Sequence, residues 1–266
     1  MIGGAVLFVA IVFCSLIGCS SELQADAVDL KLYEKRFISQ NGEDGVLQKI
    51  FNLIGTTSKY YVEFGALDGH LCANTKYLRE KYGWNGLLLD CNNPEDASIN
   101  LHNAFITAEN IVSIFKMYDV PQEFDLISID IDFNDFYVWK ALSQYYRPRV
   151  VIIEFNCVHD FDEDKIVIYD PKGYWDCTDY YGASILSFYR LGRKLGYSLV
   201  YQESQAVNLF FIRDDVLEAS GIKFKNTNDV PKLHSVPRHR LVRNDFRSGN
   251  PYDPSHRLFI SSDKVT

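Results

Sequence analysis

Apolar and polar positions follow two different periods along the middle of the chain. Residues 39–55 carry apolar side chains at helical spacing and end at a glycine, which predicts a covering helix. Short β-rich runs bounded by turn residues follow, and these predict strands at residues 59–64, 86–90, 104–108, 123–130 and 149–155. Further helices are predicted at residues 74–83, 94–103, 109–118 and 134–146. Strands and helices alternate at intervals of about 20 to 25 residues, which is typical of a parallel sheet covered on both faces.

The pattern changes after residue 155. Residues 158–182 are aromatic and acidic without a regular period, and residues 183–196 predict one more helix. Residues 197–215 contain two β-rich runs separated by a few polar residues, which predicts a hairpin whose last strand runs antiparallel. We therefore predict an α/β fold, a Rossmann-like doubly wound sheet of seven mostly parallel strands with an antiparallel last strand. Residues 221–266 contain four prolines and little periodicity, which predicts an irregular C-terminal extension.

Composition and charge narrow the classes of function. The chain has 266 residues, of which 47% are hydrophobic, enough for one large core. Its net charge of −8 argues against nucleic-acid binding, because phosphate backbones select basic surfaces. Residues 222–266 contain nine Lys and Arg against four Asp, so this basic extension carries +5 and the rest of the chain −13. The extension either lies over the acidic body or binds a partner.

The first 20 residues contain no charged side chain. Residues 5–17 form an apolar run of 13, the length of a signal-peptide core and short for a bilayer-spanning helix. Residues 16–19 (LIGC) resemble a bacterial lipobox, in which Cys19 would be lipidated, although no basic residue precedes the run. We expect residues 1–20 to direct export or to anchor the chain to a membrane. If they are no signal, the protein is cytoplasmic.

The cysteine pattern does not indicate a zinc site. None of the six cysteines forms a CxxC pair, and no Cys/His spacing is typical of zinc ligation. In an oxidising compartment Cys157 and Cys177 could pair, and two separate thiols are the alternative.

Polar residues follow the predicted strands at the edge where parallel sheets bind ligands, outside the carboxyl ends. Gly65 and Gly69 follow the first strand and would let a ligand approach the backbone closely. Asp90 ends the second strand, where an acidic side chain is placed to accept from ribose hydroxyls. The acidic and amide residues predicted at this edge are Glu63, Asp90, Asp130, Asp132, Glu154 and Asn156.

The chain also contains the segments VEFGALDGHLCANT (62–75), GLLLD (86–90), DLISIDIDFND (125–135), YGASILSFYRLGRKLGYSLV (181–200) and VNLFFIRDD (207–215). Together they resemble class I S-adenosylmethionine-dependent methyltransferases, in particular the FkbM-type branch. The resemblance covers residues 37–215 and implies a methyltransferase-like Rossmann domain with the class I methyltransferase topology.

The resemblance implies a pocket for S-adenosylmethionine. Gly65 and Gly69 would line its methionine part, Asp90 would bind the ribose, and Glu109 the adenine amine. Glu63 would accept from the ammonium group, directly or through water. The implied cofactor-binding set is Glu63, Gly65, Asp68, Gly69, Asp90, Glu109 and Asp130. A tight turn without a ligand is the alternative for the glycines.

The chain departs from the FkbM-type pattern after the fourth predicted strand, where an Asp-x-Glu-Gly motif is usual and no glycine is present here. Carboxylates after strands four and five, with an asparagine, resemble metal-dependent O-methyltransferases, in which a hard cation lowers the pKa of the substrate hydroxyl. By this analogy Mg²⁺ or Ca²⁺ would be held by Asp130, Asp132, Glu154 and Asn156. The alternatives are a solvated loop and, for Asn134 and Asp135, the cap and first-turn acid of the next helix.

Asp130 and His159 are the candidates for a catalytic base. For His159 the alternative is an ordinary buried or solvated histidine.

Three functions are consistent with these residues. The first is methyl transfer from S-adenosylmethionine to a hydroxyl of a small molecule or saccharide, with or without a divalent cation. The second is an exported, non-catalytic Rossmann-like binding module, because an exported protein would meet little of a cofactor made in the cytosol. The third takes Asp130 and Asp132 as the DxD motif of a glycosyltransferase. The acceptor and the oligomeric state stay open.

Overall fold

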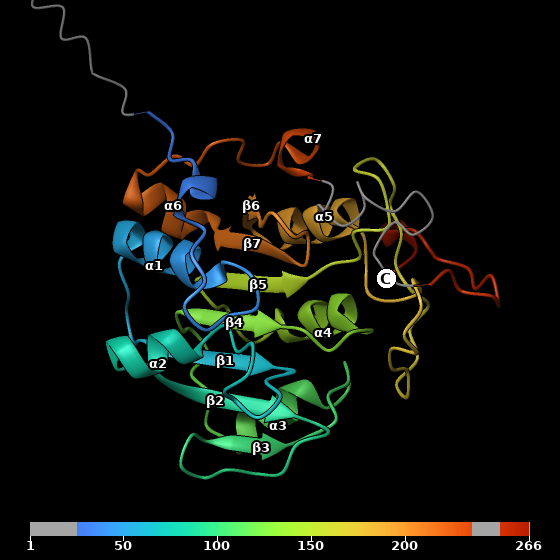
Figure 1. Ribbon diagram of the computed structural model, residues 1–266, viewed down its shortest axis with the longest axis horizontal. Helices are drawn as coiled ribbons and strands as arrows, with labels where there is room; N and C mark the ends of the chain where they lie inside the picture. Colours follow the sequence, from blue (N-terminus) through green and yellow to red (C-terminus); the bar gives the residue numbers. More distant parts are fainter. Residues whose placement is uncertain (1–25, 236–250, 266) are drawn as a thin grey trace, which may run out of the picture.

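The computed structural model describes residues 26–235 and 251–265, and within them seven strands form one mixed sheet in the order β3-β2-β1-β4-β5-β7-β6 (Figure 1). The strands are β1 (Tyr60–Phe64), β2 (Asn85–Asp90), β3 (Leu101–Asn103), β4 (Leu126–Ile129), β5 (Val150–Glu154), β6 (Tyr197–Gln202) and β7 (Asn208–Arg213). Strands β1 to β5 pair in parallel, and β7 runs antiparallel to both β5 and β6. The predicted fold class, including its reversed last strand, is confirmed.

Helices cover both faces of the sheet (Figure 1). One face packs against α1 (Glu43–Ile54), α2 (Lys76–Tyr82) and α6 (Asp214–Ser220). The other packs against α3 (Ile111–Met117), α4 (Asp135–Leu142), α5 (Ile185–Leu195) and α7 (Val230–Leu233). Two short 3-10 helices span Leu30–Tyr33 and Ser262–Lys264. The central strands are buried on both faces, which is why they read in the sequence as continuous apolar runs rather than as alternating ones.

Two predicted elements are wrong. No helix spans residues 94–103, and the third strand lies at Leu101–Asn103 rather than at residues 104–108. Asp96 accepts hydrogen bonds from the backbone N and Oγ of Ser98, and Asn100 has a positive φ of 56°, so the chain turns back there instead of continuing a helix. Local side-chain to backbone bonds of this kind compete with helix formation. Residues after Asn103 instead lead into α3.

The aromatic insertion, residues 158–182, lies beside residues 251–265 (Figure 1). Ile166 pairs by isolated bridges with both Ala183 and Ile260. The Tyr180 hydroxyl donates to the backbone oxygen of Leu258 at 3.1 Å. Residues 251–265 therefore hold the insertion from outside.

The N-terminal prediction, residues 1–20, lies outside the described residues, as does the stretch 236–250 of the basic extension. Among the described residues, no helix is long and apolar enough to cross a membrane. No disulfide bond joins the cysteines of this part of the chain, so Cys157 and Cys177 are separate thiols.

Candidate functional site

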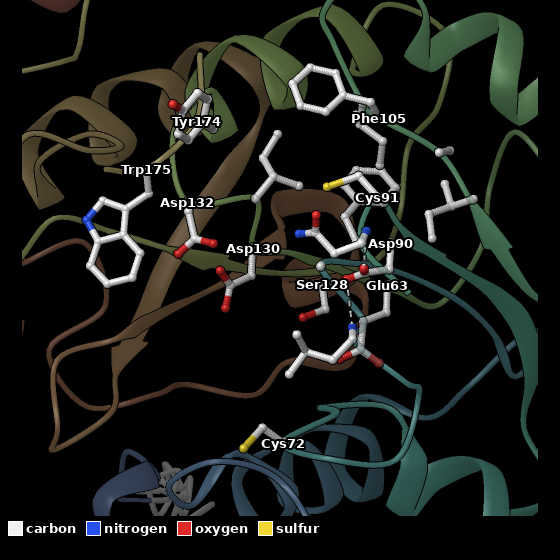
Figure 2. A pocket seen from close by; sticks show the side chains of 18 of the residues that line it. Glu63, Cys72, Asp90, Cys91, Phe105, Ser128, Asp130, Asp132, Tyr174 and Trp175 are labelled. Atoms are coloured by element: carbon white, nitrogen blue, oxygen red, sulfur yellow. Dashed lines mark hydrogen bonds between the residues drawn. The ribbon is translucent and has the colours of Figure 1, made fainter. Parts of the chain in front are cut away.

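A cavity of about 740 Å³ opens at the carboxyl ends of β1, β2 and β4. Figure 2 shows its wall, with Tyr174 and Trp175 on one side, Asp130 and Asp132 next to them, and Asp90, Cys91 and Phe105 on the other side. The edge of the sheet at which the sequence predicted a ligand site therefore contains a cavity. Of the residues implied to bind a cofactor, Glu63, Gly65, Asp90 and Asp130 line this cavity.

Gly65 sets the shape of the cavity floor. Its φ is +61°, and a Cβ added there would lie 1.7 Å from the backbone oxygen of Asp130. Only glycine allows the loop after β1 to pack this closely against the loop after β4. Gly69 is different, because its added Cβ would meet the Ile99 side chain at 2.6 Å and the residue is outside the cavity lining. Its positive φ therefore serves packing.

Asp90 fixes two loops at once. Its Oδ2 accepts from the backbone N of Leu67 at 2.9 Å, and its Oδ1 accepts from the backbone N of Asn92 and from both the backbone N and Nδ2 of Asn93. Oδ1 thus already has three donors, whereas Oδ2 has one and retains an acceptor position for a ligand hydroxyl.

Glu63 is buried and bound from within the chain. It accepts from the backbone N atoms of Asn74 and Thr75 and from the Thr75 hydroxyl, directly before α2. Burial raises the pKa of its carboxyl group. The side chain of Asn74, two residues before the start of α2, makes no capping hydrogen bond. It donates to the Ser128 hydroxyl, and its Oδ1 is buried without a partner among the described residues.

Three carboxylates meet beside the cavity. Asp130, Asp132 and Glu154 each offer an oxygen, and these oxygens lie within 4.8 Å of one another. Burial, followed by the neighbouring carboxylates, raises the pKa of Asp130 and of Glu154 well above their usual values. The Oε2 atom of Glu154 is buried without a partner in the described chain.

No lysine, arginine or histidine of the described chain lines this cavity or the smaller hollow next to it. The acid cluster (Asp130, Asp132 and Glu154) therefore lacks a protein cation beside it and is completed either by protons or by a bound cation. Carboxylate oxygens at this spacing fit a hard divalent ion.

Asn156 and Asp135 do not join the acid cluster. The Nδ2 of Asn156 donates to the backbone oxygens of Asp179 and Tyr181, and its Oδ1 accepts from the backbone N of Val158, so the whole amide holds the insertion. Asp135 is the first residue of α4 and accepts from the backbone N of Ile131 at 2.8 Å. Its position fits the first-turn acid considered from the sequence.

Three other candidates lie outside the cavity lining. Asp68 is exposed and accepts from the backbone N atoms of its own turn, and the exposed Glu109 accepts from the Tyr169 hydroxyl. His159 is buried, with its ring 4.5 Å from that of Phe259 and its Nδ1 3.7 Å from a carboxylate oxygen of Glu163. The positions of these three side chains do not support their predicted contact with a ligand.

Sequence reasoning missed several polar residues that line the cavity, among them Gln40, Asn74, Ser128 and Asn208. The Oδ1 atom of Asn208 is buried without a partner in the described chain, while its Nδ2 donates to Glu43. Asn74 belongs to the quoted loop after β1, so its place in the motif was a usable signal. Gln40 lies well before the other site residues in the chain and Asn208 well after them, so no local sequence pattern connected either residue with the site.

Comparison with known proteins gives similarities of fold alone. No family model and no curated protein matches the chain. Among solved structures, an O-methyltransferase family protein from Burkholderia thailandensis is 9% identical with a TM-score of 0.38, covering 65% of this chain and 57% of that one. The methyltransferase CalO1 of calicheamicin biosynthesis, in its SAH-bound form, is 14% identical with a TM-score of 0.34, covering 63% and 54%.

The CurJ carbon methyltransferase is 9% identical with a TM-score of 0.34, covering 64% of this chain and 52% of its own. This chain thus spans little more than half the length of the solved structures that it matches. Strand order and site geometry, rather than these similarities, support the function proposed next.

Proposed function

We propose that the protein is a class I methyltransferase of the FkbM type that transfers a methyl group from S-adenosylmethionine to a hydroxyl oxygen of a small molecule or saccharide. The observation that carries the proposal is the cavity at the carboxyl ends of β1, β2 and β4, with acidic side chains and no basic one among its described lining. A cofactor with an ammonium and a sulfonium group suits such a lining, because opposite charges attract strongly away from bulk water. Ligands bind this edge in doubly wound sheets.

The lining fits the cofactor in its polar groups as well as its charge. Asp90 would bind the ribose, the backbone at Gly65 would lie against the methionine part, and Glu63 would face the ammonium group. The buried acceptor oxygens of Asn74 and Asn208 have no partner in the described chain, and they offer hydrogen bonds to a ligand. The cofactor supplies an electrophilic methyl group, so the chain itself must position the acceptor and remove its proton.

The acid cluster is the group placed to remove that proton. Asp130 lines the cavity, whereas His159 does not, so Asp130 is the favoured base. A carboxyl group with a raised pKa is a more effective base near neutral pH than an ordinary one. A divalent cation held by Asp130, Asp132 and Glu154 would lower the pKa of the hydroxyl instead.

Two cysteines allow a sharp test. Cys91 lines the cavity and Cys177 does not, and both are exposed. We expect S-adenosylmethionine and its demethylated product to bind in calorimetry and to slow alkylation of Cys91, read by peptide mass spectrometry, while alkylation of Cys177 stays unchanged. Asp90→Asn should weaken binding about tenfold or more, as loss of a charged hydrogen-bond partner does. Absence of binding to folded protein would remove both the cofactor and the reaction.

A non-catalytic binding module is the second candidate. The observation that favours it is that the carboxylates of Glu63 and Asp90 already accept hydrogen bonds from backbone groups of the chain itself. Binding without turnover in the calorimetric test, or no binding, would select it. The glycosyltransferase is disfavoured because the described lining has no basic side chain for a diphosphate, and titration with UDP-sugars and Mg²⁺ tests it.

We also propose that residues 1–20 direct export or anchor the chain through Cys19. Labelling with a radioactive fatty acid, compared between the natural chain and Cys19→Ser, tests the anchor. Loss of label in the variant supports it, and label in neither protein contradicts it.

A further inference from the structure

A smaller hollow of about 250 Å³ adjoins the main cavity. The two share the lining residues Gln40, Asp130, Asp132 and Trp175, so they form one continuous space with two acids at the junction. A transfer between two ligands needs such adjacent compartments. The smaller hollow is thus placed to hold the acceptor when the larger one holds the cofactor.

The smaller hollow offers groups that suit a hydroxylated ring. The side-chain amides of Gln40 and Gln205 make no hydrogen bond within the described chain, which leaves donors and acceptors for hydroxyl groups. The indole N–H of Trp175 already donates to the backbone oxygen of Thr178 at 2.7 Å, so its ring is what remains for a ligand. Tyr181 lies edge-on to it, with ring centroids 6.4 Å apart. Amides and aromatic faces together recognise rings that have both hydroxyl groups and apolar faces.

The charge of this space selects against anions. Asp130, Asp132 and Glu154 lie in the wall of the smaller hollow, without a lysine, arginine or histidine among its described lining. An acceptor with a carboxylate or phosphate next to these groups would be repelled. The head group that fits is not an anion, and the side-chain amides of Gln40 and Gln205 suit hydroxyl groups.

Exposed apolar side chains form part of the mouth of the main cavity. Leu67, Leu71, Phe105 and Tyr174, from three separate loops, line the cavity and are between 41% and 72% exposed. Single exposed apolar side chains are ordinary, but four at one opening mark a site that contacts an apolar ligand. The apolar rim (Leu67, Leu71, Phe105 and Tyr174) continues outward from the polar interior.

Building on the proposed function, we propose that the acceptor is a nonionic amphiphile. Its hydroxylated ring would lie in the smaller hollow beside Asp130, and its apolar chain would lie on the apolar rim. The acidic described lining of the smaller hollow, which disfavours anions, and the continuity of the rim with the cavity support this occupant over a protein partner or a bare membrane surface.

Tryptophan fluorescence provides the test. Trp175 is half-exposed, whereas Trp84 and Trp139 are 3% and 1% exposed, so a change in emission on ligand binding reports the site. The protein, saturated with demethylated cofactor, is titrated with methyl, hexyl and octyl β-glucosides below their micelle concentrations. We expect affinity to rise roughly threefold to fourfold per added methylene group, the effect of burying one such group, until the rim is covered. Octyl β-glucuronide, which has a carboxylate, and octanol, which has no ring, should bind at least tenfold more weakly than octyl glucoside.

Variants separate the two parts of the site. Leu71→Ser and Tyr174→Ser should flatten the dependence on chain length, and Gln205→Ala should weaken all glucosides by the same factor. Met117→Ser is the matched control, because Met117 is 71% exposed on α3 and outside the cavity lining.

Where ligands bind, three patterns of affinity would overturn the inference. They are equal affinities for methyl and octyl glucoside, tight binding of the glucuronide, and octanol binding as tightly as octyl glucoside. The first or third would point to a simple polar ligand or to a purely apolar partner. If the cofactor binds and no glucoside does, the acceptor class is wrong and the proposed function stands. If the cofactor also fails to bind, both are wrong.

Discussion

Asp135 has a buried carboxyl group whose charge destabilises the folded chain. One oxygen accepts from the backbone N of Ile131, and Oδ2 is buried without a partner in the described residues. Burial, with a further contribution from the charge of Asp132, raises its pKa from 3.8 to about 7. We predict that Asp135→Asn, which retains the acceptor oxygen and cannot ionise, makes the protein more stable at alkaline pH.

The sign and size follow from the shift in pKa. The unfolded chain loses the Asp135 proton near pH 3.8 and the folded chain retains it up to about pH 7, so folding stability falls as pH rises between these values. At about 1.4 kcal/mol per pKa unit, the shift corresponds to a loss of about 4 kcal/mol at most. The stability difference between the variant and the natural protein should therefore shift by up to about 4 kcal/mol in favour of the variant between about pH 4 and pH 8.

Urea denaturation followed by circular dichroism, in EDTA to keep cations from the acid cluster, measures this difference at each pH. Asp253→Asn is a control of opposite sign, because a hydrogen bond from Arg257 lowers the pKa of Asp253 to about 2. Its stabilising effect is present above the unfolded pKa of 3.8 and is lost as pH falls toward 2, so this variant should be least favourable at neutral pH. A constant difference for Asp135→Asn over the whole pH range would refute the reasoning.

Three further predictions concern the framework of the site. Gly65→Ala should lower the free energy of unfolding, measured by urea denaturation, by at least about 2 kcal/mol and should abolish cofactor binding. Gly83→Ala is the control: Gly83 has the same sign of φ and open space where a Cβ would lie, so this variant should lower the free energy of unfolding by only about 1 kcal/mol. Arg149→Met should lower the free energy of unfolding by about 3 to 5 kcal/mol, because it leaves the fully buried carboxylate of Asp125 without its ion-pair partner at 2.7 Å. Arg257→Gln should speed limited proteolysis within residues 158–182 while the thermal midpoint changes little, because the lost ion pair with Asp176 holds the insertion rather than the sheet. Cleavage at the natural rate would contradict this role.

The sheet was predictable because its strands are buried on both faces. Short apolar runs such as residues 86–90 and 149–155 have few alternative structures, and the polar residue after each run marks the sheet edge. The error at residues 94–103 has a local cause. Pro94 and the acids behind it are typical of a helix start, but the Asp96 side chain bonds to Ser98 and closes a turn instead.

The site was predictable only where it depends on strand ends. Asp130 follows β4 and Glu154 ends the adjacent parallel strand β5, so topology alone brings them together. Asn156 lies two residues farther along, where the chain has already left the sheet, and its amide binds backbone atoms of the insertion. Trp175 and Gln205 lie in irregular segments whose positions depend on contacts with distant parts of the chain, and no periodic pattern indicates such contacts.

The support of the insertion by residues 251–265 has a consequence for the order of assembly. Arg257 bonds to Asp176, 81 positions before it in the chain, and lies over the ring of Tyr180. During synthesis the sheet, complete by residue 213, can form well before these contacts exist. A newly made chain would therefore pass through a stage with a finished core and an unfinished ligand site, in which Tyr174 and Trp175 on one side of the cavity are accessible to proteases and chaperones.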